Sequence, residues 1–199
     1  MVAVAEVQVH AISTGNTEID KKLGGGIPPG SLTLIEGESD SGKSVLVQQM
    51  TWGSLRSGCG VSVLTTENTV SSLVKQMQSL NLDILDYCLL GRLRIYPVQA
   101  MKIGNGPNEA LQVLLDALGK QQGRDLVIID SVTSFIAHAT PEHTIAFFEE
   151  CKGYSNMGMT IVAVAHSYAF KEGTLVRLSS MCDAHLRLRI ENMGEKLMK

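Results

Sequence analysis

A run of small and polar residues near the start of the chain has the composition and spacing of a site for phosphate groups. It reads Gly37-Glu38-Ser39-Asp40-Ser41-Gly42-Lys43-Ser44 and matches the pattern G-x-x-x-x-G-K-S/T. Glycine at both ends of the loop permits backbone angles that a Cβ would hinder, so the N–H groups can turn inward around an anion. Lys43 would place a positive charge near the β- and γ-phosphates of a nucleotide, and the Ser44 hydroxyl would be a ligand for Mg²⁺.

The segments on both sides of this run predict the elements that must position it. Residues 31–36 are rich in β-forming residues and follow a Pro-Pro-Gly turn, which indicates a strand. From Lys43 onward the apolar residues have helical spacing until Gly58 and Gly60 end the pattern. The positive end of that helix would point at the same anion site. This order of strand, loop and helix favours a phosphate site over a Gly/Ser surface loop.

Three further polar residues stand at the ends of apolar runs that predict buried strands. They are Glu67, Asp130 and His166. Because ligands of open α/β sheets bind at the carboxyl ends of the strands, we expect all three near the loop. Asp130 would hold Mg²⁺ through the water shell of the ion, opposite Ser44. A buried carboxylate without a cation would be costly, which favours this interpretation over a purely structural aspartate.

The other polar residues leave alternatives open. Glu67 would orient or deprotonate the water that attacks the γ-phosphate, or it is a solvent-exposed carboxylate at a strand end. His166 would sense the γ-phosphate or donate to it, or it makes a polar loop contact. Ser131 and Ser134 are interpreted as turn or helix-cap groups, because no base is adjacent. Five basic residues are solvated charges or would supply a charge across a subunit boundary: Lys171, Arg177, Arg187, Arg189 and Lys196.

Strand and helix patterns alternate along the remaining chain, which predicts an α/β fold with a mainly parallel central sheet flanked by helices. Further helices are expected at 17–23 and 70–80 and after the openings at 105–107 and 140–142, and a further strand at 93–96. Residues 182–191 alternate apolar and polar, which indicates a strand with one solvated face. With a turn at 192–194, this strand would form a C-terminal antiparallel edge hairpin. We expect one domain over residues 1–199.

Composition narrows the class of protein. The chain has 199 residues, 44% of them hydrophobic, with a formal net charge of −3 and a pI of about 5.9. This acidic balance counts against a broad nucleic-acid surface. Its four cysteines are dispersed, which suits reduced thiols in a cytoplasmic protein and gives no zinc-ligand spacing. No apolar run reaches the roughly 18 residues that a membrane span needs.

The chain resembles the RecA/KaiC-type P-loop ATPases over almost its whole length. The resemblance includes the lead-in of residues 14–20 and 24–30, the Glu67 position, Ile129-Asp130-Ser131 and the polar end of Val162–His166. Within that superfamily it is most similar to the accessory ATPases of the archaeal flagellum, the archaellum. The resemblance implies an ATP- and Mg²⁺-binding component of a hexameric ring, which docks onto the archaellum motor ATPase and the membrane platform or ring proteins. It also implies a cytoplasmic location, peripheral to the membrane-bound motor, and slow or absent hydrolysis.

Two departures from the pattern affect this expectation. KaiC-type relatives often carry two consecutive carboxylates where this chain has Glu67 followed by Asn68, which weakens an inference of rapid turnover. They also often continue into a basic segment that reaches a neighbouring subunit, whereas here the sequence stops at Lys199, so that element is absent or the sequence is truncated. The alternative function is an active KaiC-like or recombinase-type ATPase that acts on DNA or on a protein partner.

Overall fold

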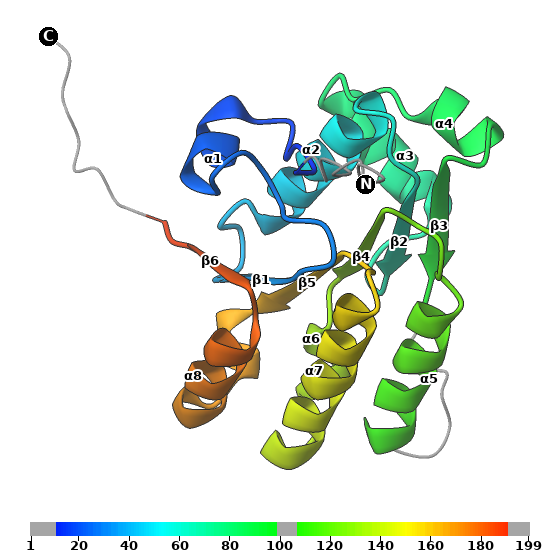
Figure 1. Ribbon diagram of the computed structural model, residues 1–199. Helices are drawn as coiled ribbons and strands as arrows, with labels where there is room; N and C mark the ends of the chain where they lie inside the picture. The colour runs from blue at the N-terminus through cyan, green and yellow to red at the C-terminus, as the bar shows by residue number, and fades with distance from the viewer. Residues whose placement is uncertain (1–10, 99–106, 191–199) are drawn as a thin grey trace, which may run out of the picture.

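The centre of the molecule is a six-stranded sheet of order β3-β2-β4-β5-β1-β6 in which every pairing is parallel (Figure 1). The computed structural model describes residues 11–98 and 107–190. The strands are β1 (Leu32–Gly37), β2 (Val61–Thr65), β3 (Leu93–Pro97), β4 (Leu126–Asp130), β5 (Ile161–His166) and β6 (Ala184–Leu188). The mainly parallel α/β fold predicted from the alternation of patterns is therefore confirmed.

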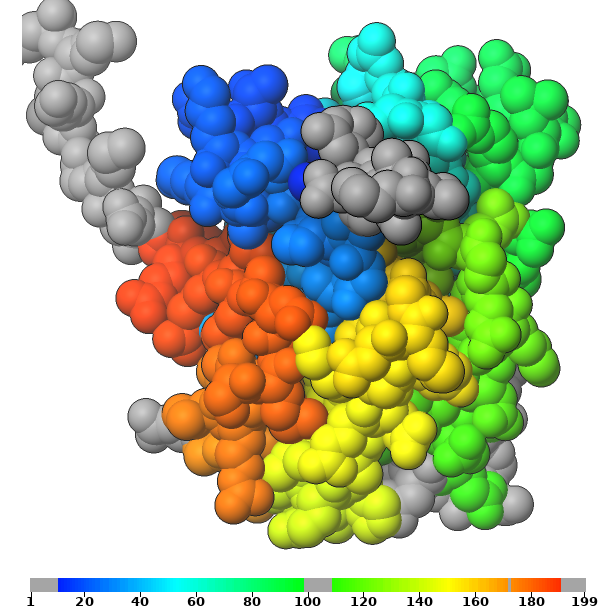
Figure 2. All heavy atoms as spheres, in the orientation of Figure 1, coloured from blue at the N-terminus to red at the C-terminus, as the bar shows by residue number. Residues whose placement is uncertain are grey.

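Helices cover both faces of this sheet. They are α1 (Thr17–Lys22), α2 (Lys43–Arg56), α3 (Val70–Ser79), α4 (Leu85–Leu89), α5 (Pro107–Gly119), α6 (Thr133–Ile136), α7 (Pro141–Asn156) and α8 (Glu172–Met181), with a 3₁₀ turn, η2 (Ser167–Ala169). Helices α2, α3 and α4 pack on one face and α5 to α8 on the other. In the space-filling view, α5, α7 and α8 form a closely packed row below the sheet (Figure 2). Because both faces are covered, strands β1, β2 and β4 are buried along their whole length.

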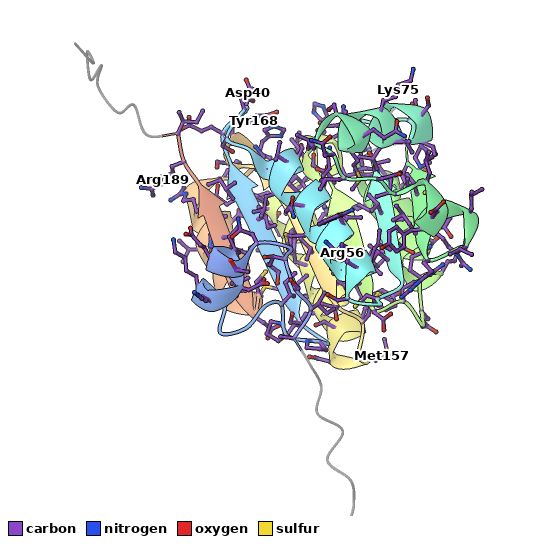
Figure 3. The ribbon with its side chains drawn as sticks, turned by 90° about the horizontal axis from the view of Figure 1, so that it is seen from above. Asp40, Arg56, Lys75, Met157, Tyr168 and Arg189 are labelled. Atoms are coloured by element: carbon purple, nitrogen blue, oxygen red, sulfur yellow. The ribbon has the colours of Figure 1, made fainter. Side chains whose placement is uncertain are left out.

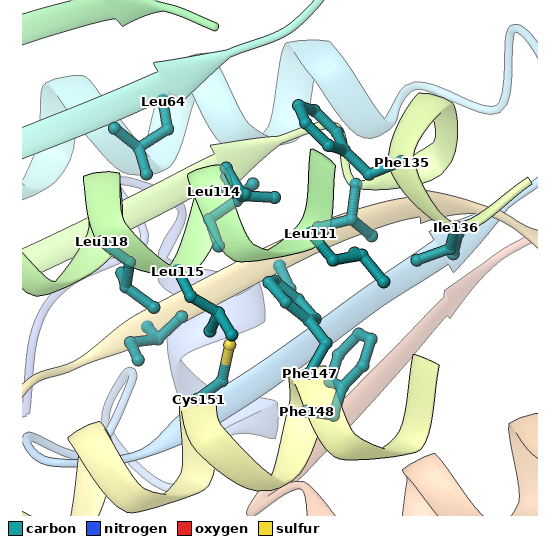
Figure 4. Packing of buried hydrophobic residues seen from close by; sticks show 14 of the residues in the cluster. Leu64, Leu111, Leu114, Leu115, Leu118, Phe135, Ile136, Phe147, Phe148 and Cys151 are labelled. Carbon is teal, nitrogen blue, oxygen red and sulfur yellow. The ribbon is translucent and has the colours of Figure 1, made fainter. Parts of the chain in front are cut away.

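The larger part of the core lies between the sheet and the α5–α8 layer. Four leucines of α5 are all buried: Leu111, Leu114, Leu115 and Leu118. They face Phe147, Phe148 and Cys151 of α7 (Figure 4). The rings of Phe147 and Phe148 meet edge to face with centroids 5.4 Å apart, which is a favourable aromatic geometry. This packing holds the carboxyl ends of β4 and β5 in place beside the phosphate loop.

Local capping explains where several helices begin. The side chain of Asn16 accepts from the backbone N–H groups of Glu18 and Ile19, so Asn16 is the cap of α1. Thr140 caps α7 in the same way, and Pro141 occupies the first turn, where its missing N–H costs nothing. The helices expected at 17–23, at 70–80, and after 105–107 and 140–142 are therefore present.

The C-terminal strand expected within residues 182–191 is present as β6. Its alternation is present, with His185 and Arg187 exposed between partly buried neighbours. The strand β6 pairs parallel to β1 at the edge of the sheet, and the second arm of the expected antiparallel hairpin would lie beyond the described residues. This parallel pairing is possible because residues 172–181 form helix α8, which returns the chain to the starting end of the sheet. The turn predicted at 192–194 lies outside the described residues.

Candidate functional site

The phosphate-loop residues follow β1 directly and end at the first turn of α2. Gly42 has a φ of 88° and Asp40 a φ of 59°, both in the left-handed region that permits a tight reversal. At Gly37 the constraint is space, since a Cβ there would stand 2.6 Å from Leu188 O and from Ser41 Oγ. These features turn the loop back over the start of α2, where the helix dipole favours an anion.

The ammonium group of Lys43 lies inside the loop. Its Nζ donates to Gly37 O at 3.0 Å and to Glu38 O at 2.5 Å, and the residue is only 6% exposed. Burial lowers the pKa of Lys43, while the carboxylates of Glu67 and Asp130 oppose that shift. A cation held by backbone carbonyls at the base of the loop is placed to meet an anionic ligand there.

Glu67 and Asp130 come together because β2 and β4 are neighbours, with Thr65 opposite Asp130 in the register. The Ser131 hydroxyl donates to Glu67 Oε1 at 3.0 Å. The hydroxyl of Thr66 donates to Ser131 O at 2.9 Å, and Ser131 N–H donates back to Thr66 Oγ1 at 3.1 Å. Ser131, interpreted from the sequence as a turn or cap residue, thus orients the Glu67 carboxylate.

The Asp130 carboxyl is buried, with 7% of the residue exposed. Its pKa is raised from 3.8 to about 6, mainly by desolvation and then by the nearby charge of Glu67, with Lys43 acting in the opposite direction. Two neighbouring carboxyl groups in a partly closed site are the donor set that a hard divalent cation prefers. The Ser44 hydroxyl, which is exposed on the first turn of α2, would complete that set.

His166 is held by two neighbours that the sequence does not indicate. Thr133 Oγ1 accepts from the backbone N–H of His166 at 2.9 Å and lies 3.2 Å from the ring atom Nδ1. The ring of Tyr168 stacks on the imidazole, with centroids 5.1 Å apart and planes inclined by 23°. Burial and the charge of Lys43 lower the pKa of His166, with Glu67 and Asp40 opposing, so the neutral ring is favoured.

One pocket of about 430 Å³ gathers these groups. Loop residues 39–45 line it together with Glu67, Asp130, Ser131, Val164 and His166. Figure 3 shows Asp40 of the loop and Tyr168 at the same edge of the view, and Met157 at the opposite edge. The structure therefore brings together the loop, Glu67, Asp130 and His166, as expected from their positions at strand ends.

A larger pocket, of about 620 Å³, lies at the other end of the sheet. It is lined by residues that precede strands β2, β4 and β5, including Cys59, Arg124, Asp125 and Thr160. Ligands of open parallel sheets bind at the carboxyl ends of the strands, and this pocket lacks the glycine-rich anion loop. The smaller pocket is therefore the better candidate. Among the described residues, no group of three or more His, Cys, Asp or Glu side chains is arranged to hold a metal by itself.

A buried carboxylate ties the phosphate loop to the C-terminal strand. Glu36, the residue before Gly37, has a side chain that is 0% exposed. Arg187 Nε of β6 lies 2.5 Å from Glu36 Oε1 as an ion pair, without the alignment of a hydrogen bond, and His185 Nε2 lies 3.6 Å from the same oxygen. The Ser167 hydroxyl donates to Oε2. Arg187, proposed from the sequence as a solvated charge or a charge for a neighbouring subunit, thus pairs within its own chain.

Replacing Arg187 with alanine should destabilise the fold by about 1–3 kcal/mol, because it leaves a buried carboxylate without its cation. The midpoint of urea unfolding measures this loss. Adding Glu36→Gln to the Arg187→Ala chain should recover part of it, since no charge then remains buried. Arg189→Ala, at the exposed residue that follows β6 (Figure 3), is the matched control and should change little. Equal destabilisation of the single and double variants would contradict this account.

Sequence reasoning missed Glu36, Thr133, Ser167 and Tyr168. One signal for Glu36 was available, because a carboxylate inside an otherwise buried strand needs a partner. Nothing in the sequence pairs it with Arg187, since the two meet only because β6 lies beside β1. Ser134, in contrast, is exposed on α6, and the described structure gives it no contact with the pocket.

A parallel sheet with a glycine-rich loop, a buried lysine and a strand-end aspartate defines a P-loop ATPase of the RecA-like fold. The model of the KaiC family of ATPases, described as "ATPase: KaiC", matches residues 12–199, and the chain belongs to this family. This confirms the superfamily resemblance read from the sequence.

Within this family, the chain is similar to individual proteins that share one name. The chain is 30% identical over 191 residues to the archaeal flagellar ATP-binding protein FlaH of Sulfolobus acidocaldarius, covering 94% of this chain and 83% of that protein. It is 28% identical over 195 residues to FlaH of Methanocaldococcus jannaschii, covering 96% and 82%. The crystal structure of the flagellar accessory protein FlaH from M. jannaschii superposes with a TM-score of 0.81 at 28% identity, covering 94% of this chain and 83% of that one.

Proposed function

We propose that this chain is an ATP-binding regulatory and assembly component of the archaellum machinery, with slow or absent ATP hydrolysis. The observation that carries the proposal is the single pocket shared by the phosphate loop, Glu67, Asp130 and His166. The names of the similar proteins supply the cellular setting. Bound ATP would act as a conformational ligand, because only a ligand with different affinities for two states can shift the population between them.

The residues present fit ATP with Mg²⁺. Lys43 and the N-terminal turn of α2 would bind the β- and γ-phosphates, and the loop residues Gly37, Glu38, Ser39, Asp40, Ser41 and Gly42 would enclose them. Ser44 would bind Mg²⁺ directly, and Asp130 through water. Glu67 would orient the attacking water, and His166 would contact the γ-phosphate. Bound Mg²⁺ would supply positive charge that neutralises the phosphates. The residues named above would bind and orient the nucleotide and the attacking water.

The surroundings of Glu67 support slow turnover. Its Oε1 accepts a hydrogen bond from the Ser131 hydroxyl, which occupies one of its lone pairs and restrains the carboxylate. The adjacent Asn68, where relatives often carry a second carboxylate, turns its Oδ1 toward α3 and accepts from Ser72 Oγ and Gln76 Nε2, both at 3.1 Å. The site therefore offers one restrained carboxylate to a water molecule rather than two.

We also propose an oligomeric state and protein partners for this chain. We infer a homo-oligomeric, hexameric ring in which residues 1–199 form one domain of each subunit. This ring would contact the archaellum motor ATPase and the membrane platform or ring proteins from the cytoplasm. Among the described helices, none combines the length and apolar character needed to cross a membrane. Mass measurement of the purified chain with and without Mg²⁺-ATP tests the ring, and monomers at micromolar concentration in ATP would contradict it.

Partner binding is the direct test of the proposed function. The motor ATPase should bind the chain more tightly in ATP than in ADP, by about 5- to 150-fold, the usual range of coupling between two sites. Titration calorimetry with each nucleotide measures the difference, and equal affinity in both would refute the regulatory role.

Single-turnover hydrolysis tests the alternative function. Rapid hydrolysis that single-stranded DNA stimulates and Glu67→Gln abolishes would favour a recombinase-type ATPase instead. The slow turnover proposed here predicts no such stimulation. A DNA-dependent activity should also weaken steeply with rising salt.

A further inference from the structure

A contact between Thr133 and the ring of His166 sets which ring nitrogen faces the nucleotide pocket. Thr133 is the first residue of α6, is 7% exposed, and stands beside β5, of which His166 is the last residue. Thr133 Oγ1 lies 3.2 Å from Nδ1 of the ring. This leaves Nε2 as the ring nitrogen for the pocket that His166 lines.

The hydrogen count at Thr133 Oγ1 decides the tautomer. A threonine hydroxyl has one hydrogen and two lone pairs, and one lone pair already accepts the backbone N–H of His166 at 2.9 Å. If Nδ1 carried the proton, it would use the second lone pair, and the hydroxyl hydrogen would be buried without any acceptor among the described residues. If Nδ1 is unprotonated, it accepts that hydrogen and every group is satisfied. The unpaired donor is the costly arrangement.

The surroundings of the ring agree with this assignment. The doubly protonated ring is disfavoured, because burial and the charge of Lys43 lower the pKa of His166, although Glu67 and Asp40 oppose that shift. Stacking on Tyr168 restrains the ring plane, which hinders a half-turn of the ring that would carry Nδ1 away from Thr133.

We propose that Thr133 is a positioning residue that keeps the proton of His166 on Nε2, so that the ring offers an N–H donor to the terminal phosphate of ATP. The inference rests on the proposed binding of ATP in this pocket. With the other tautomer, a nitrogen lone pair would face an anionic oxygen and repel it. Because ADP lacks the γ-phosphate, the N–H donor would favour ATP over ADP.

The first measurement needs no nucleotide. In ¹⁵N-labelled protein at a pH well above the ordinary histidine pKa of about 6.5, two-bond ¹⁵N–¹H correlations report which ring nitrogen of His166 carries the proton. We expect Nε2 in the natural chain and in Thr133→Ser, and a mixture of tautomers in Thr133→Val. A proton on Nδ1 of the natural chain would overturn the inference. The spectrum of His166→Gln assigns the signal.

The second measurement is the ratio of ATP to ADP affinity. Thr133→Val should lower it about 2-fold, because a roughly equal mixture of tautomers leaves about half of the molecules with the donor on Nε2, and Thr133→Ser should preserve it. Valine also removes the acceptor for the His166 backbone N–H. A second pair of variants, in which Thr133 is unchanged, is therefore needed. His166→Gln, whose amide N–H can occupy the place of Nε2, should keep more of the preference than His166→Asn. An equal loss in Gln and Asn would contradict a donor role for Nε2.

The chain offers a matched control. Thr140 Oγ1 lies 2.8 Å from Nδ1 of His143 at the start of α7, a second threonine–histidine pair that does not line the pocket. Thr140→Val should leave the affinity ratio unchanged. If the natural chain binds neither nucleotide, the proposed function fails, while the tautomer measurement still decides the role of Thr133. If ATP binds and Thr133→Val keeps the full preference, the inference fails and the proposed function stands.

Discussion

Replacing Lys43 with alanine should lower the affinity for Mg²⁺-ATP by about 10- to 100-fold. A hydrogen bond to a charged group contributes roughly 1.5–3 kcal/mol, and Lys43 would make such bonds to the β- and γ-phosphates from a position that is 6% exposed. In the variant, water would replace little of this interaction with the phosphates, because the place of the ammonium at the base of the loop is buried. Isothermal titration calorimetry with ATP measures the loss.

The loss should not come from unfolding. Burial already lowers the pKa of Lys43, so the folded state disfavours its charge relative to water, and an uncharged side chain removes that cost. We therefore expect Lys43→Ala to unfold at the same temperature as the natural chain or slightly higher. Lys75→Ala, an exposed lysine on α3 (Figure 3), is the matched control and should bind ATP normally. Affinity of Lys43→Ala within threefold of the natural chain would remove the loop from the proposed site.

The site could be predicted from the sequence where its residues follow local patterns. The loop, Glu67, Asp130 and His166 each stand at the end of an apolar run, and the carboxyl ends of parallel strands meet at one edge of the sheet. Their meeting in one pocket is therefore a consequence of fold class alone. No knowledge of strand order beyond parallel pairing was needed.

The groups that restrain these residues could not be predicted, because they depend on which strands are neighbours. Arg187 reaches Glu36 only because β6 lies beside β1, and Thr133 reaches His166 only because β4 lies beside β5. Alternation in residues 182–191 reports one solvated face but carries no information about strand direction. The direction was decided by α8, a ten-residue helix whose apolar stripe is weak and which contains Gly173.

Asp130→Asn should stabilise the protein and weaken its binding of Mg²⁺-ATP at the same time. The pKa of Asp130 is about 6 in the folded state against an ordinary 3.8, so the folded state holds a proton that the unfolded state releases between these values. Raising the pH through that window therefore favours unfolding, and at pH 7 the ionised carboxylate costs on the order of 2–3 kcal/mol. Asparagine removes this cost, which corresponds to a rise in Tm of roughly 5–10 °C for a chain of this size.

The pH dependence separates this explanation from a general gain in packing. Near pH 3 the carboxyl is protonated in both states, so the stabilisation by Asp130→Asn should nearly disappear there, grow through pH 5 and reach its full size above pH 7. Differential scanning calorimetry across this range measures it, with the exposed Asp116→Asn of α5 as the control. At the same concentration, Mg²⁺-ATP should raise the Tm of the natural chain more than that of the variant, because the variant binds this ligand more weakly. A gain in Tm that is equal at pH 4 and pH 7 would show that the buried charge of Asp130 is not its cause.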